Sequence, residues 1–63
     1  MLEFSKNILR KVSFDKRLFR KELRKAIRWS NREERLALQA WCVLTFGHMY
    51  GDIITDCFTQ VVL

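Results

Sequence analysis

The chain has 63 residues, with no proline, two glycines and two cysteines. It is too short for two hydrophobic cores, so we expect residues 1–63 to form a single small helical domain. The scarcity of glycine and proline excludes a protein of many strands and turns, and the 49% hydrophobic content argues against disorder. The expected fold class is all-α, a small bundle of three to four short helices with a central helix hairpin.

The net charge of +5 is unevenly distributed along the chain. All twelve Lys and Arg residues lie in residues 1–35 with five acids, which gives that half a charge of +7. Residues 36–63 contain two acids and no Lys or Arg, and therefore carry −2 with the histidine neutral. A field concentrated on one side attracts nucleic acid, an anionic membrane or an acidic protein surface.

The first expected helix covers about residues 4–12, where Phe4, Ile8 and Val12 recur at steps of four. A helix this short is marginal alone in water, so it needs support from the rest of the chain. Ser13 is the expected N-cap of the next helix. Asp15 follows at a position where its negative charge interacts favourably with the positive end of the helix dipole.

The second expected helix, residues 14–29, has two chemically different sides. At about 100° per residue, seven cations share one half of the helical wheel, which we call the basic face: Lys16, Arg17, Arg20, Lys21, Arg24, Lys25 and Arg28. The opposite half is apolar, with Ile27 at the boundary, and consists of Leu18, Phe19, Leu23, Ala26 and Trp29. No acid alternates with the cations, so like charges four residues apart repel one another without relief. This pattern favours a binding surface over a face that is only solvated.

The third expected helix begins near residue 32 and ends near residue 46. Ser30 with Glu33, or Asn31 with Glu34, can form a reciprocal capping box at its start. The short connection between residues 29 and 32 predicts that the second and third helices form a hairpin.

Apolar residues surround this third helix almost completely, so we expect it to be the central helix, with Trp41 and Leu44 buried. Gly47 is the expected left-handed residue that ends it. Asp52 is the expected cap of a last helix whose apolar residues recur at helical steps: Ile53, Ile54, Cys57, Phe58, Val61 and Val62. A strand over residues 61–63 is the alternative, but it would have no partner.

The basic face supplies what phosphate binding needs, since cations several turns apart can follow a nucleic-acid backbone. A helix-turn-helix is not expected, because its second helix needs polar side chains for base edges and residues 32–46 are nearly all apolar. Stacking on single strands is not expected either, since Phe14, Phe19 and Trp29 fall mostly on the apolar side. We therefore expect an accessory protein that binds structured RNA by shape and phosphate. Ribosomal RNA is the abundant folded phosphate of a cell, which favours association with the ribosome.

The alternative is a protein-interaction module or small subunit of a complex, in which the basic face contacts an acidic protein surface. In this reading residues 36–63 pack against a partner or against a second copy in a homodimer, because they hold more apolar surface than one amphipathic helix can cover. Membrane binding ranks third, since the apolar side of the second helix is needed to cover the later helices.

We expect no enzyme, no cofactor and no metal site. His48 is the only histidine and has no positioned carboxylate or nucleophile nearby in the pattern, and Asp52 with Asp56 lacks further oxygen ligands for a cation. The opening residues show no signal-peptide pattern, and Cys42 and Cys57 lie among apolar neighbours, as is usual for thiols in a reducing compartment. The expected location is the cytoplasm.

Overall fold

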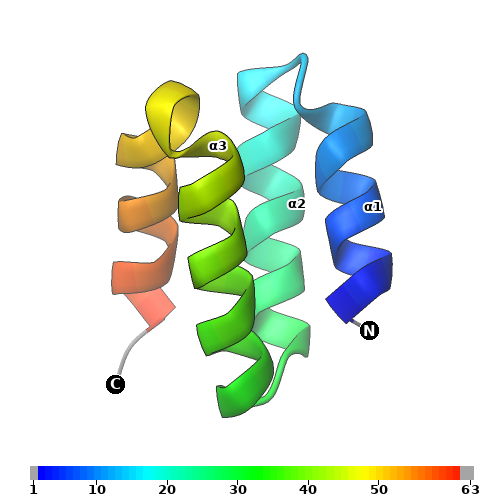
Figure 1. Cartoon of the computed structure of the whole chain (residues 1–63), viewed down its shortest axis with the longest axis vertical. Coiled ribbons are helices and arrows are strands. Elements are labelled where there is room, and N and C mark those ends of the chain that lie inside the picture. Colours follow the sequence, from blue (N-terminus) through cyan, green and yellow to red (C-terminus); the bar gives the residue numbers. More distant parts are fainter. Residues whose placement is uncertain (1, 62–63) are drawn as a thin grey trace.

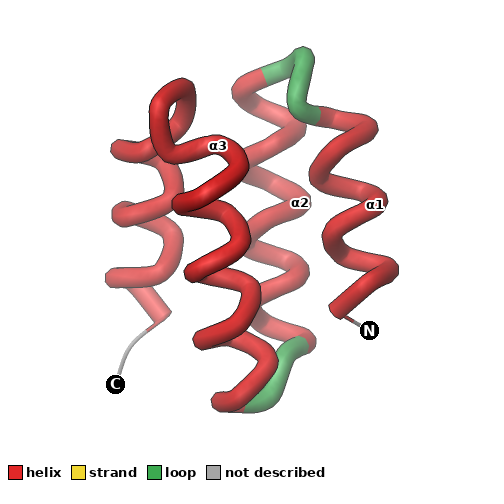
Figure 2. The backbone as a smooth tube through the Cα atoms, in the orientation of Figure 1, coloured by secondary structure: helices red, strands yellow, loops and turns green. Residues whose placement is uncertain are grey.

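The computed structural model describes the backbone of residues 2–61 and the side chains of residues 3–59. Within these residues the chain is all-helical, with α1 (Leu2–Val12), α2 (Lys16–Trp29) and α3 (Arg32–Val61), and no strand. The predicted all-α class is confirmed. Figure 1 shows α1 and α2 running in opposite directions, and α2 and the first part of α3 doing the same. The short connections that join them are the loops in Figure 2.

The chain reverses its direction inside α3. A straight helix of 30 residues would be about 45 Å long, whereas the longest extent of the molecule is 27 Å. The reversal occurs at Tyr50, whose backbone angles (φ −125°, ψ 30°) are not helical. Figure 1 shows the second part of α3 returning beside the first, so α3 contributes two helical segments to the bundle.

Gly47 does not end the helix as predicted. It lies within α3, and no glycine in the described residues has a positive φ. Asp52 also lies within α3, two residues after the kink at Tyr50 that separates the predicted last helix from the third. Of the predicted last helix, Val62 and the side chain of Val61 lie outside the described residues.

The core lies where α2 meets both parts of α3 and one side of α1. Phe19 is at its centre, with its ring 5.0 Å from that of Phe46 and 4.7 Å from that of Tyr50, centroid to centroid. The buried apolar residues are Leu9, Phe19, Leu23, Ala26, Ile27, Leu38, Cys42, Phe46, Ile53, Ile54, Cys57 and Phe58. The apolar second part of α3 is therefore covered largely by the chain itself.

The prediction that the third helix is central was wrong. α2 packs against both α1 and α3, whereas α1 and α3 contact one another much less. In the first part of α3 only one side is buried, through Leu38, Cys42 and Phe46 at steps of four. Leu44 is 85% exposed, contrary to prediction, and Trp41 is partly buried against the core.

The helix ends confirm one predicted cap and correct another. Asn31 and Glu34 form the capping box, because Asn31 N donates to Glu34 Oε1 at 3.0 Å and Glu34 N donates to Asn31 Oδ1 at 2.8 Å. Asp15, rather than Ser13, is the N-cap of α2, and its Oδ1 accepts from the amides of Arg17 and Leu18. The helix therefore begins at Lys16, two residues later than predicted.

The buried side of α1 is also shifted from the predicted stripe. Leu9 is fully buried and Ser5 nearly so, whereas Phe4 is 62% exposed. Lys6 and Arg10 lie over the ring of Trp41, with their charged ends 5.7 and 5.3 Å from its centroid. These cation–π contacts tie α1 to α3.

Candidate nucleic-acid interface

Most of the basic face lies on the side of α2 that the other helices leave exposed. Phe19, Leu23 and Ile27 are buried on the opposite side of the same helix. Six of the seven predicted residues are exposed, and Arg20 is partly buried: Lys16, Arg17, Arg20, Lys21, Arg24, Lys25 and Arg28. A row of exposed cations along one helix of 14 residues can contact successive phosphates of a nucleic acid.

Two members of the basic face also face the second part of α3. Arg20 Nη1 donates to Asp56 Oδ2 at 3.4 Å, and both side chains are nearly half exposed. The charges of Arg20 and Arg24 also lie close enough to Cys57 to oppose the rise in its thiol pKa. These two arginines therefore serve the fold as well as the surface, which the repeat of like charges in the sequence did not reveal.

Among the remaining members, Arg17, Lys21 and Arg28 are exposed on the side of α2 away from its buried residues. No described acid forms an ion pair with any of them. Their mutual repulsion is relieved only by solvent or by an anionic partner.

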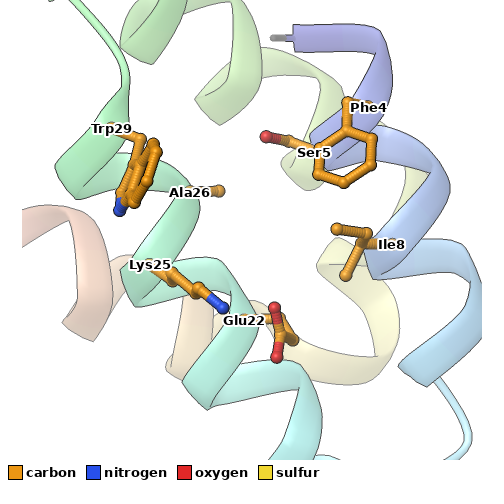
Figure 3. Close-up of a pocket in the computed structure, with 7 residues that line it drawn as sticks. All are labelled: Phe4, Ser5, Ile8, Glu22, Lys25, Ala26 and Trp29. Atoms are coloured by element: carbon orange, nitrogen blue, oxygen red, sulfur yellow. The ribbon is translucent and has the colours of Figure 1, made fainter.

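An open groove lies beside the basic face, between α1 and α2. Its volume is about 280 Å³. Its lining is mostly apolar and consists of Phe4, Ser5 and Ile8 from α1 and Glu22, Lys25, Ala26 and Trp29 from α2. Figure 3 shows the rings of Phe4 and Trp29 on opposite sides of the groove, with Lys25 and Glu22 at one end.

The exposed rings correct the prediction that the aromatic residues of the second helix are core. Phe19 is fully buried as predicted, but Trp29 is 67% exposed and Phe14 is 80% exposed. Leu18, also predicted as core, is partly exposed, while the boundary residue Ile27 is buried. Trp29 therefore offers an aromatic surface next to Lys25 and Arg28, which sequence reasoning missed.

The helical wheel of α2 contains one signal for the groove. Glu22 lies on the apolar side of α2, between Trp29 and Ala26 on the helical wheel, where a charged residue is not expected to pack in a core. Phe4 lies one helical turn from Ile8, a spacing that does not show which helix, if any, covers its ring. Only the packing of α1 against α2 shows that Glu22 and Phe4 line an opening.

The two thiols lie inside the bundle, on the inner side of α3. Burial, with a smaller contribution from nearby Cys57, raises the pKa of Cys42 to about 12. Burial also raises the pKa of Cys57, although Arg20 and Arg24 oppose the rise. Both thiols are therefore neutral near pH 7 and behave as small apolar core residues.

The outer side of α3 is a second exposed surface, different in chemistry from the basic face. It carries apolar residues at steps of three and four: Leu36, Ala37, Ala40, Val43 and Leu44. We call these residues the outer apolar face. No helix of the described chain is long and apolar enough to span a bilayer, and no three metal-binding side chains of residues 3–59 form a group that could hold an ion.

Comparison of the chain with models of protein families, with curated proteins and with solved structures found no match. The fold and the surfaces thus define only a class, a small all-helical protein with a cationic helix face beside an aromatic groove.

Proposed function

We propose that the protein is a non-catalytic accessory protein that binds structured RNA through the basic face of α2, in a ribonucleoprotein such as the ribosome. The observation that carries the proposal is the exposure of Arg17, Lys21 and Arg28 on the side of α2 away from the other helices. Cations with this placement repel one another in the free protein, and phosphates remove that repulsion.

RNA suits this surface better than a duplex DNA site. In a helix-turn-helix made of α2 and α3, the helix that reads base edges would be α3, whose exposed side carries the apolar Leu36, Val43 and Leu44. Recognition of folded RNA by phosphates and shape needs no reading of base edges. The proposed location is the cytoplasm, where the thiols of Cys42 and Cys57 stay reduced.

The test uses the double variant Lys21→Gln with Arg28→Gln, which removes two exposed cations and keeps good helix formers. Binding to a fluorescent stem-loop RNA is measured as a function of salt concentration. We expect weaker binding, and a salt slope reduced by about 0.7 to 0.9 for each lost phosphate contact. Arg20 and Arg24 are left intact because both interact with the rest of the bundle.

The matched control is Lys11→Gln with Arg32→Gln, which removes the same charge from exposed positions of α1 and α3 outside the basic face. The control should keep nearly the full salt slope. Equal losses in both variants, or no binding of the unaltered protein at low salt, would contradict the proposal.

The outer apolar face supports a second candidate, a protein-interaction module or homodimer. Leu36, Val43 and Leu44 are exposed and lie at steps that bring them to one side of α3. Clusters of this kind are typical of protein contacts. Sedimentation over a range of concentrations separates the candidates, since a monomer at all concentrations would exclude the homodimer.

A further inference from the structure

We infer that the groove between α1 and α2 is a site for one unstacked RNA base, which stacks on Trp29 while its neighbouring phosphates contact the basic face. This inference rests on the proposed function and adds a preference for unpaired over fully paired RNA. Its first support is the exposure of Trp29, whose ring forms one side of the groove in Figure 3.

The groove has the chemistry that a nucleobase needs. A base has an apolar, polarisable face and a polar edge, so it binds in sites that combine aromatic walls with a few hydrogen-bonding groups. Phe4, Ile8 and Trp29 supply the apolar walls, and Ala26 leaves the floor open because its side chain is small. Ser5 and Glu22 supply the polar atoms at the lining.

Charge complementarity selects a nucleic acid over an apolar peptide as the occupant. Lys25 belongs both to the lining of the groove and to the basic face, so the two surfaces are continuous. Lys21 and Arg28 lie one turn from Lys25 along α2, at positions i−4 and i+3. A strand whose base enters the groove thus meets cations on the adjoining side of the helix, where its own phosphates would lie.

Glu22 gives the site a base preference. Its carboxylate can accept a hydrogen bond from an exocyclic amino group, as carboxylates do from N4 of cytosine. Uracil has a carbonyl oxygen at the corresponding position, which a carboxylate repels. We therefore expect cytosine to be bound more tightly than uracil at the unpaired position.

The test compares a stem-loop RNA carrying a loop of cytosines with a fully paired RNA of the same number of phosphates. In the variant Trp29→Leu an apolar side chain of moderate size is kept and the ring is lost. We expect affinity for the looped RNA to fall about 5-fold or more. Affinity for the paired RNA and the salt slope should be unchanged, because no phosphate contact is removed.

The matched control is Phe14→Leu, which removes another exposed ring outside the groove. It should bind both RNAs as the unaltered protein does. Glu22→Gln should reduce the preference for a cytosine loop over a uracil loop, and circular dichroism should show unchanged helix content in all three variants.

The outcomes separate this inference from the proposed function. If both RNAs bind with the expected salt slope and Trp29→Leu has no selective effect on the looped RNA, the base site is wrong and the phosphate-binding face stands. If the unaltered protein binds neither RNA at low salt, both are wrong. An equal loss for Trp29→Leu and Phe14→Leu also overturns the base site, since the rings would then act as general surface.

Discussion

The two long helices contrast in a way that their compositions do not suggest. α2 contains seven cations among 14 residues and is nevertheless the helix around which the others pack. α3 is far more apolar and exposes one whole side of its first part. A helix becomes central when its few apolar residues lie close together on the side that its neighbours share, whatever its overall hydrophobicity.

The same substitution, Leu to Ala, made once in each helix tests this contrast most strongly. Leu23→Ala in α2 removes a fully buried side chain, whereas Leu44→Ala in α3 removes one that is 85% exposed. We expect Leu23→Ala to cost about 2 to 5 kcal/mol, enough to unfold so small a domain. Leu44→Ala should change stability by about 0.5 kcal/mol or less. Chemical denaturation followed by circular dichroism measures both, and comparable losses would mean that the outer apolar face is buried in solution.

The burial of Cys42 on the inner side of α3 should make the stability of the protein fall at high pH. Because the pKa of Cys42 is raised from 9.0 to about 12 in the folded protein, its contribution to stability is complete below pH 9 and is lost as the pH approaches 12. At about 1.4 kcal/mol per pKa unit, the loss is on the order of 4 kcal/mol at most.

Chemical denaturation of the unaltered protein and of Cys42→Ala across this pH range separates the effect of ionising this thiol from the effects of ionising the lysines and Tyr50. The unaltered protein should lose more stability than Cys42→Ala. Equal losses in the two proteins would show that Cys42 is accessible to water.

A smaller loss of stability than that of Leu23→Ala is expected at the reversal of α3, where Tyr50 Oη donates to the carbonyl oxygen of Ser13 at 2.6 Å. Tyr50→Phe removes this bond between the reversal and the α1–α2 turn while leaving the ring beside Phe19. The cost should be about 1 kcal/mol, measured by thermal unfolding. A loss as large as that of Leu23→Ala would mean that the bond, rather than ring packing, holds the reversal in place.

Local patterns in the sequence predicted the helical class and several of its details. The Asn31–Glu34 capping box follows from four residues of sequence, because each partner lies within reach of the other's backbone. The exposure of Lys21 and Arg28 follows from their place opposite Phe19 and Leu23 on one helix. Such features depend on helix periodicity alone.

Features that depend on how the helices pack against one another could not be predicted from helix periodicity. The apolar pattern predicted Trp29 on the core side of its helix and Leu44 buried, yet both are exposed, as is Phe4. Apolar character does not say which neighbour, if any, covers a side chain, and the partial opening between α1 and α2 decides this for Trp29 and Phe4. In α3, the reversal at Tyr50 determines which side is buried. The returning segment covers the inner side of the first part through Ile53 and Phe58 and leaves the outer side exposed.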